Sequence, residues 1–428
     1  MKDLTDRALN TAASLGATYS DVRVVDRVEQ TVSTKNGLVN RVNQTQDRGF
    51  GVRVVADGAW GFASSASLTV EEVDRVTALA VNIARASALV QKSKVNLGPP
   101  VSQTGHYRTP VEIDPFSIPL EQKIALLLEA DAAMRRVQGL RVSEGTVLCL
   151  RENKTFASSE GSFIEQEIIE TGCGITATAV GQGEIQRRSY PNTFGRNQAA
   201  RGWEFVLEAD LSGHGEQIAS EAVALLTADQ CPSGVTTIIL GGAQLALQIH
   251  ESCGHPIELD RVYGTEAAYA GTSFLTTDKL NTFRYGSDIV NLTADATIPG
   301  GLGTFGYDDE GVPAQRVPIV RQGMFVGYLS SRETAAQLGL PGSGGAMRAS
   351  GWNRIPLIRM TNVNLEPGEW TFDDLVADTD EGIYMEMNRS WSIDDKRLNF
   401  QFGTELAYEI KNGKLGRLLK NATYTGVT

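Results

Sequence analysis

Two tight turns constrain the fold of the N-terminal part more strongly than any other feature of the sequence. Asn36-Gly37 and Asp57-Gly58 each lie between runs in which apolar and polar residues alternate. Such dipeptides between alternating runs are typical of two-residue β-hairpins. Apolar residues at helical spacing flank these strands over residues 3–16 and 69–88. We therefore predict an α+β domain over residues 1–94.

The rest of the chain divides into three segments. Residues 95–118 are rich in Pro, Gly and Ser, which predicts a linker. Residues 119–228 begin with a helical pattern and continue as short runs between turn signals, which predicts a helix followed by an antiparallel meander. Residues 229–428 are rich in strand patterns, and an apolar run at 234–240, which predicts a buried strand, leads into a predicted helix at 243–253. The predicted fold class is α+β, with a mixed N-terminal domain and a β-rich C-terminal domain that contains one buried, motif-bearing helix.

Charge and composition exclude some classes of function. The net charge of −12 argues against a nucleic-acid-binding surface. The sequence has no run of 18 apolar residues and no secretory h-region at its start, so we expect no membrane span and a cytoplasmic location. The four cysteines lack C-x-x-C spacing and do not indicate a disulfide framework; they are Cys149, Cys173, Cys231 and Cys253.

The most informative motif for function is His250-Glu251-Ser252-Cys253-Gly254-His255, which holds two of the four histidines. Imidazoles bind zinc, and a nearby carboxylate takes a proton from water. The common zinc motif places its histidines at i and i+4. At i+5, a regular helix would separate the two side chains by roughly 140°, too far for one metal ion. Either a π-bulge widens the turn, or the helix ends near Gly254 and His255 swings back.

Other residues near the motif are candidates for lesser roles. Glu251 is the predicted general base, and the alternative is a solvated glutamate on the helix surface. Asp260 is a candidate for orienting an imidazole. Arg348 is a candidate for binding a peptide carboxylate or carbonyl. Cys253 is too close in sequence to be a convenient ligand, so we expect it to pack in the core or to line the site. The acidic run at 308–311 is predicted to be an acidic turn rather than a hard-cation site, because it lacks calcium-loop spacing.

Several distinctive segments together carry a resemblance to a known family. The chain resembles the TldD/PmbA family of metallopeptidases, and specifically its TldD-like branch, over nearly its whole length. PmbA-like members typically lack H-E-x-x-x-H, which this chain has. The segments that carry the resemblance are 16–23 (GATYSDVR), 49–53 (GFGVR), 58–63 (GAWGFA), 250–256 (HESCGHP), 307–311 (YDDEG), 359–362 (RMTN) and 412–414 (NGK).

The resemblance implies a zinc-dependent peptidase that cleaves unfolded or flexible peptides inside a protected chamber. His250 and His255 would hold one zinc ion per chain, and Glu251 would be the catalytic base. The resemblance also implies a dimer, either of identical subunits or with a PmbA-like paralogue.

One departure from the family pattern concerns the third zinc ligand. In the family this is usually a cysteine in a C-terminal segment, and the sequence reaches Thr428 about where that segment would begin. Either the chain is truncated or the third position is filled differently, and a chain with two imidazoles alone would be metal-free or inactive. The alternative function is therefore a non-catalytic subunit that binds a peptide or a partner.

Overall fold

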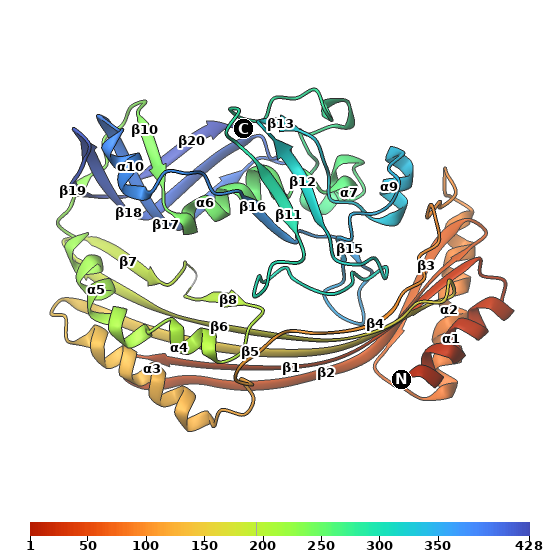
Figure 1. Ribbon diagram of the computed structural model, residues 1–428. Coiled ribbons are helices and arrows are strands. Elements are labelled where there is room, and N and C mark those ends of the chain that lie inside the picture. The colour runs from red at the N-terminus through yellow and green to blue at the C-terminus, as the bar shows by residue number, and fades with distance from the viewer. Residues whose placement is uncertain (194) are drawn as a thin grey trace.

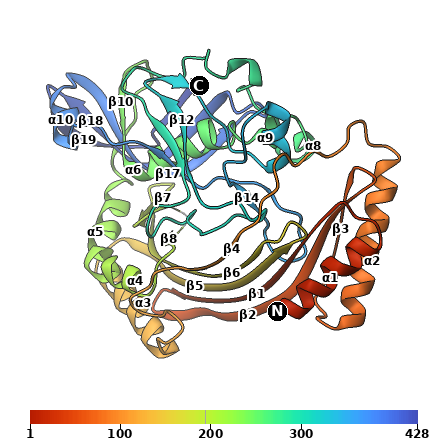
Figure 2. The same cartoon turned by 45° about the vertical axis from the view of Figure 1, so that its right-hand side comes forward.

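One long, curved sheet forms the base of the molecule. The computed structural model describes residues 1–193 and 195–428, and in both views the C-terminal part lies across one face of this sheet (Figure 1, Figure 2). The strand order is β3-β2-β1-β5-β6-β4, and β7 and β8 also pair with β6. The strands are β1 (Tyr19–Lys35), β2 (Leu38–Ala56), β3 (Ala59–Ser65), β4 (Thr104–Arg108), β5 (Leu140–Ser158), β6 (Phe163–Gly181), β7 (Glu184–Tyr190) and β8 (Asn197–Ala199).

Both N-terminal hairpins form as predicted. Asn36 and Gly37 have φ angles of 50° and 80°, and they join β1 to β2. Two predictions were wrong. β5, β6 and β7 pair antiparallel in chain order, as a meander does, but β5 and β6 are 19-residue strands and not the short ones that we predicted. The segment 95–118, predicted as a linker, contributes β4, which pairs in parallel with β6. The predicted N-terminal and middle segments therefore share one sheet, and the division into domains stays an interpretation.

Helices cover the two ends of this sheet (Figure 1). At one end α1 (Lys2–Ser14) and α2 (Val70–Ala88) pack on β1, β2 and β3. At the other end α3 (Leu120–Arg135), α4 (Glu204–Glu208) and α5 (Leu211–Ala224) pack on β5 and β6. Each end thus has its own hydrophobic core. None of the helices in the described part of the chain is both long and apolar enough to cross a membrane.

The C-terminal part contains three smaller sheets and short helices, so the predicted α+β class is confirmed. Its strands are β9 (Asp229–Gln230), β10 (Thr237–Leu240), β11 (Leu292–Asp295), β12 (Arg316–Arg321), β13 (Met324–Phe325), β14 (Met347–Arg348), β15 (Leu357–Ile358), β16 (Asn362–Leu365), β17 (Glu381–Ile393), β18 (Asn399–Lys411), β19 (Lys414–Lys420) and β20 (Thr423–Val427). Its α-helices are α6 (Gly242–Ile249), α7 (Leu259–Val262), α8 (Ala267–Ala270), α9 (Arg332–Leu338) and α10 (Phe372–Ala377).

The strand that precedes the motif helix differs from its prediction. We predicted a buried strand over residues 234–240, but β10 is an edge strand that pairs in parallel with β17. Val235 is fully exposed, and Ile239 is buried. An apolar run alone does not reveal whether a strand is central or at an edge.

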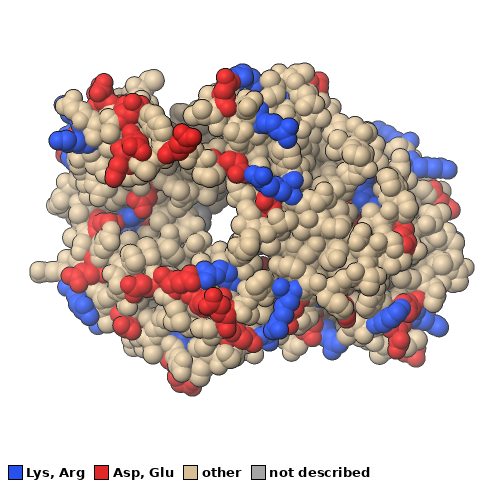
Figure 3. Space-filling model, in the orientation of Figure 1, with Lys and Arg blue, Asp and Glu red and all other residues tan. Residues whose placement is uncertain are grey.

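Buried ion pairs join the C-terminal part to both ends of the long sheet. At the end that carries β3 and β4, Asp309 pairs with Arg23 at 3.1 Å and with Lys154 at 2.6 Å. At the end that carries β7, Glu405 pairs with Arg188 at 3.4 Å. Between these attachments the molecule is hollowed, and the space-filling view shows an opening there (Figure 3).

Candidate metal centre

The helix that carries the motif changes its winding at the first histidine. α6 continues directly into a π-helical turn over His250–Gly254. The backbone N–H of His255 donates to the carbonyl of His250 at 3.1 Å, which is an i to i+5 hydrogen bond. This wider turn brings residues five apart onto one face of the helix. Of the two arrangements that the sequence left open, the π-bulge is therefore the one that forms.

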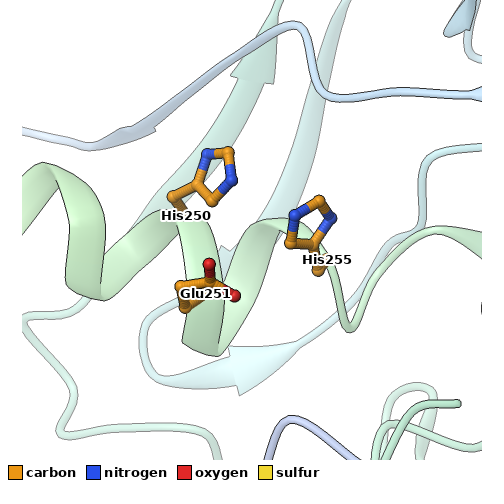
Figure 4. Close-up of side chains that lie close together, drawn as sticks. All are labelled: His250, Glu251 and His255. Atoms are coloured by element: carbon orange, nitrogen blue, oxygen red, sulfur yellow. The ribbon is translucent and has the colours of Figure 1, made fainter. Parts of the chain in front are cut away.

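The π-turn places both imidazoles beside the intervening carboxylate. One potential ligand atom from each of His250, Glu251 and His255 lies within 4.8 Å of the others. The two rings are 4.6 Å apart between centroids and nearly perpendicular, at 82°. In the close-up the two rings lie near each other, and the Glu251 side chain lies below them in this view (Figure 4). Two nitrogens and an oxygen gathered in this way match the donor set that zinc prefers.

Both imidazoles are held in the neutral form that can bind a metal. Burial lowers the pKa of His250, and the neighbouring His255 lowers it further. Burial, followed by the nearby Arg261, lowers the pKa of His255 to about 3. At neutral pH each ring therefore keeps a nitrogen lone pair for a cation.

A carboxylate orients the second imidazole, but it is not the one we predicted. Glu258 Oε2 lies 2.9 Å from His255 Nδ1, so Nδ1 carries the proton that it donates and Nε2 keeps a lone pair. Glu258 is fully buried and also pairs with Arg261. The predicted residue, Asp260, instead accepts hydrogen bonds from the backbone N–H groups of Arg261 and Ile358. Asp260 is buried against other acids, and its pKa is raised to about 7, first by burial and then by Glu258 and Glu266.

These contacts predict different effects of two neighbouring carboxylates on zinc affinity. Glu258→Gln should weaken zinc binding on the order of 10–100-fold, because the His255 ring loses its charged partner. Asp260→Asn is the matched control and should leave zinc affinity unchanged. Competition with a chromophoric chelator measures both affinities. Equal zinc affinities in the two variants would contradict the assignment of Glu258.

Glu251 is not a solvated residue on the helix surface, which was the alternative to a base. Its side chain is 8% exposed, and Oε2 accepts a hydrogen bond from Arg397 Nη1 at 2.6 Å. The hydrogen bonds between described residues engage only this one of its two oxygens. Sequence reasoning missed Arg397, which is 146 residues away along the chain and carries no local signal.

The metal centre opens into the hollow beneath the C-terminal part. His250 and Arg348 line a cavity of about 540 Å³ between this part and the long sheet. Arg348 donates to the Met360 carbonyl at 3.2 Å, and burial lowers the pKa of its guanidinium. The sheet contributes polar residues to the same cavity: Arg27, Glu152, Lys154 and Glu170.

The π-turn packs closely against other residues of the C-terminal part. A Cβ added at Gly254 would lie 2.1 Å from Met360 Sδ, so a larger residue at this position would force the Met360 side chain to move. Cys253 is 1% exposed in the C-terminal core and therefore packs rather than lines the site. Burial raises the pKa of its thiol to about 12.

The acidic run is a buried hub of ion pairs rather than an ordinary acidic turn. Asp308 accepts hydrogen bonds from three backbone N–H groups, Asp309 pairs with Arg23 and Lys154, and Glu310 pairs with Arg53. The three carboxylates therefore bind groups of the protein itself. Among the residues that the structure describes, His250, Glu251 and His255 form the one group of metal-ligating side chains.

Comparison with known proteins identifies the class of protein to which the chain belongs, which is that of the metallopeptidases. Three family models match the chain, described as PmbA/TldA metallopeptidase domain 1 (residues 20–84), central domain (residues 113–227) and C-terminal domain (residues 233–428). These matches cover most of the sequence. The chain belongs to the PmbA/TldD family of metallopeptidases.

Similar curated proteins carry related names. A metalloprotease of Methanocaldococcus jannaschii is 31% identical over 95% of this chain and 86% of its own length. A metalloprotease TldD homolog of Haemophilus influenzae is 26% identical over 95% and 82%. A zinc metalloprotease TldD homolog of Saccharolobus solfataricus is 22% identical over 97% and 88%.

Two solved structures share the fold. One, described as a modulator of a DNA gyrase from Thermotoga maritima, has a TM-score of 0.80 at 18% identity and covers 100% of this chain and 92% of its own. The other is TldE from Thermococcus kodakarensis, with a TM-score of 0.78 at 16% identity over 99% and 90%. At these identities the likeness concerns the fold alone.

Proposed function

We propose that this chain is a zinc-dependent peptidase, with His250 and His255 as ligands and Glu251 as general base. The observation that carries the proposal is the convergence of these three side chains within 4.8 Å. Zinc, when bound, would polarise a carbonyl and increase the acidity of water. Glu251 would accept a proton from the attacking water and pass it to the leaving nitrogen as the carbon–nitrogen bond breaks.

The cavity supports a flexible peptide as the substrate. A space of about 540 Å³ is in the range of small-ligand sites, whereas a folded domain of about 100 residues has a radius of gyration near 13 Å. An extended chain can enter such a space and a folded domain cannot. Arg348 lines the same cavity, and we propose that it binds a peptide carboxylate or carbonyl.

A second candidate function is a non-catalytic subunit that binds peptide. Catalytic zinc sites normally have three protein ligands. Here two imidazoles lie beside a carboxylate that Arg397 already holds, and this favours the second candidate. The fold shared with TldE supports a further proposal, that the chain works as a dimer, with a second copy or with a PmbA-like paralogue. We also propose a cytoplasmic location.

Zinc-dependent hydrolysis separates the two functions. The chain stripped of metal and reloaded with one equivalent of zinc should cleave an unstructured, fluorescently quenched peptide. The same sequence placed inside a stably folded domain should resist cleavage, because it cannot enter the cavity. A chain that binds the peptide but cleaves none, with or without zinc, would support the non-catalytic function instead.

A further inference from the structure

Arg397 reaches the metal centre from a distant part of the C-terminal fold. It lies in the turn between β17 and β18 and is 16% exposed. Its Nη1 donates to Glu251 Oε2 at 2.6 Å, and its Nη2 donates to the Ala270 carbonyl at 3.1 Å. Its buried Nε has no partner among the described residues. The two terminal nitrogens therefore set the orientation of this guanidinium.

The backbone of this turn is held in an unfavourable conformation. Arg397 has a φ of 62°, in the left-handed region that a residue with a Cβ seldom adopts. Such backbone persists where the surroundings over-determine it, and it clusters at functional sites. Here Thr272 N–H donates to the Asp395 carbonyl at 2.8 Å, and Phe274 N–H donates to the Lys396 carbonyl at 2.9 Å. These bonds fix the turn against the segment that follows α8.

A close approach between the two segments makes this attachment possible. A Cβ at Gly271 would lie 2.4 Å from the Asp395 carbonyl oxygen, and Gly271 itself has a φ of 77°. Only glycine allows the two backbones to meet at this distance. The position of Arg397 is thus set by backbone contacts and does not depend on its ion pair with Glu251 alone.

A second arginine makes a similar pair of contacts, one with an acid and one with the same carbonyl. Arg261 pairs with Glu258, which binds His255, and Arg261 Nη1 donates to the same Ala270 carbonyl at 2.7 Å. The Ala270 carbonyl therefore accepts a hydrogen bond from both arginines. Arg261 orients a proposed zinc ligand through Glu258, whereas Arg397 binds the proposed base directly.

We propose that Arg397 is a positioning residue that keeps Glu251 acting as a base and prevents it from becoming a zinc ligand. This inference rests on the proposed function. A free carboxylate beside two imidazoles is itself a good zinc ligand. By binding Oε2, the guanidinium holds one oxygen away from the cation and leaves Oε1 to accept a proton from water.

Substitution of Arg397 in the zinc-loaded full chain tests this role. Arg397→Ala should lower kcat on the order of 10–100-fold, with KM for the quenched peptide and zinc content unchanged. Arg397→Lys keeps the charge but not the planar fork, so its kcat should fall between those of Arg397→Ala and wild type. Millimolar guanidinium should restore part of the kcat of Arg397→Ala. Arg417→Ala, which removes an exposed arginine from the same sheet, is the control and should leave kcat unchanged.

Zinc affinity distinguishes this role from a purely structural one. Arg397→Ala should bind zinc more tightly than wild type, because Glu251 is released, and Glu251→Gln added to it should abolish the gain. This comparison decides the proposal even if wild type cleaves no peptide, in which case the proposed function fails separately. Weaker zinc binding in Arg397→Ala, or a kcat equal to or above that of wild type, would overturn the proposal.

Discussion

Replacing Glu251 with glutamine is expected to lower peptide hydrolysis by about 10²–10⁴-fold, the usual contribution of a positioned general base. Glutamine has nearly the same shape and can still accept a hydrogen bond from Arg397, but it cannot accept a proton from water. Zinc content should remain that of wild type, because His250 and His255 are intact. Initial rates on the quenched peptide and zinc analysis of the same samples provide the two measurements.

A matched variant separates this effect from a general loss of structure. Glu121 is exposed on α3, far from the motif helix, so Glu121→Gln should hydrolyse the peptide at the wild-type rate. Hydrolysis by Glu251→Gln within a fewfold of wild type would show that another group takes the proton.

Removing the buried carboxylate of Asp309 is expected to be the most damaging change to stability. Asp309 is 1% exposed and pairs with Arg23 and Lys154 from the long sheet. Asp309→Ala would leave two buried or nearly buried cations without their partner, and breaking such a group costs about 3–5 kcal/mol. Denaturant unfolding should show this loss. Asp6→Ala, which breaks an exposed pair with Lys2, should leave the unfolding midpoint nearly unchanged.

The ion pairs of Asp309 also predict how its contribution to stability depends on pH. Burial alone would raise the pKa of Asp309, but Lys154 and Arg23 lower it to about 2 from an ordinary value of 3.8. A carboxyl with a lowered folded-state pKa stabilises the protein above pH 3.8 and loses that contribution as the pH falls toward 2. The difference in unfolding free energy between wild type and Asp309→Ala should therefore narrow over this interval. A difference that stays constant or widens there would mean that Asp309 does not act through its charge.

Local chemistry explains which parts of the fold were predictable. Asn36-Gly37 specifies its hairpin through backbone preferences of the two residues themselves. The i+5 spacing of His250 and His255 required either a widened or a terminated helix, and the structure has the widened one. Both features depend on residues that are neighbours in sequence.

The long strands were misread because their middle parts are polar on both faces of the sheet, between the two ends that the helices cover. Arg27, Glu152, Lys154 and Glu170 lie on β1, β5 and β6 and face this space. On the opposite face of β5, Arg151 and Asn153 are polar as well, so the middle of the strand lacks the alternation of apolar and polar residues by which strands are recognised. This polar middle part therefore conceals the length of the strands.

The supporting residues of the metal centre could be predicted only in part. Glu258 is three residues from His255, but the path of the chain after a helix end decides whether Glu258 or Asp260 faces the imidazole. Arg397 is 146 residues from Glu251, and Asp309 is 286 from Arg23. Such contacts exist only in the folded chain, and no local spacing indicates them.

X-ray diffraction recorded at the zinc absorption edge, from crystals of the zinc-loaded chain, tests the central claim most directly. We expect one anomalous peak between the rings of His250 and His255, about 2.0–2.1 Å from a nitrogen of each. A zinc-loaded crystal with no peak between these rings, or with its zinc bound elsewhere, would contradict the assignment of this site.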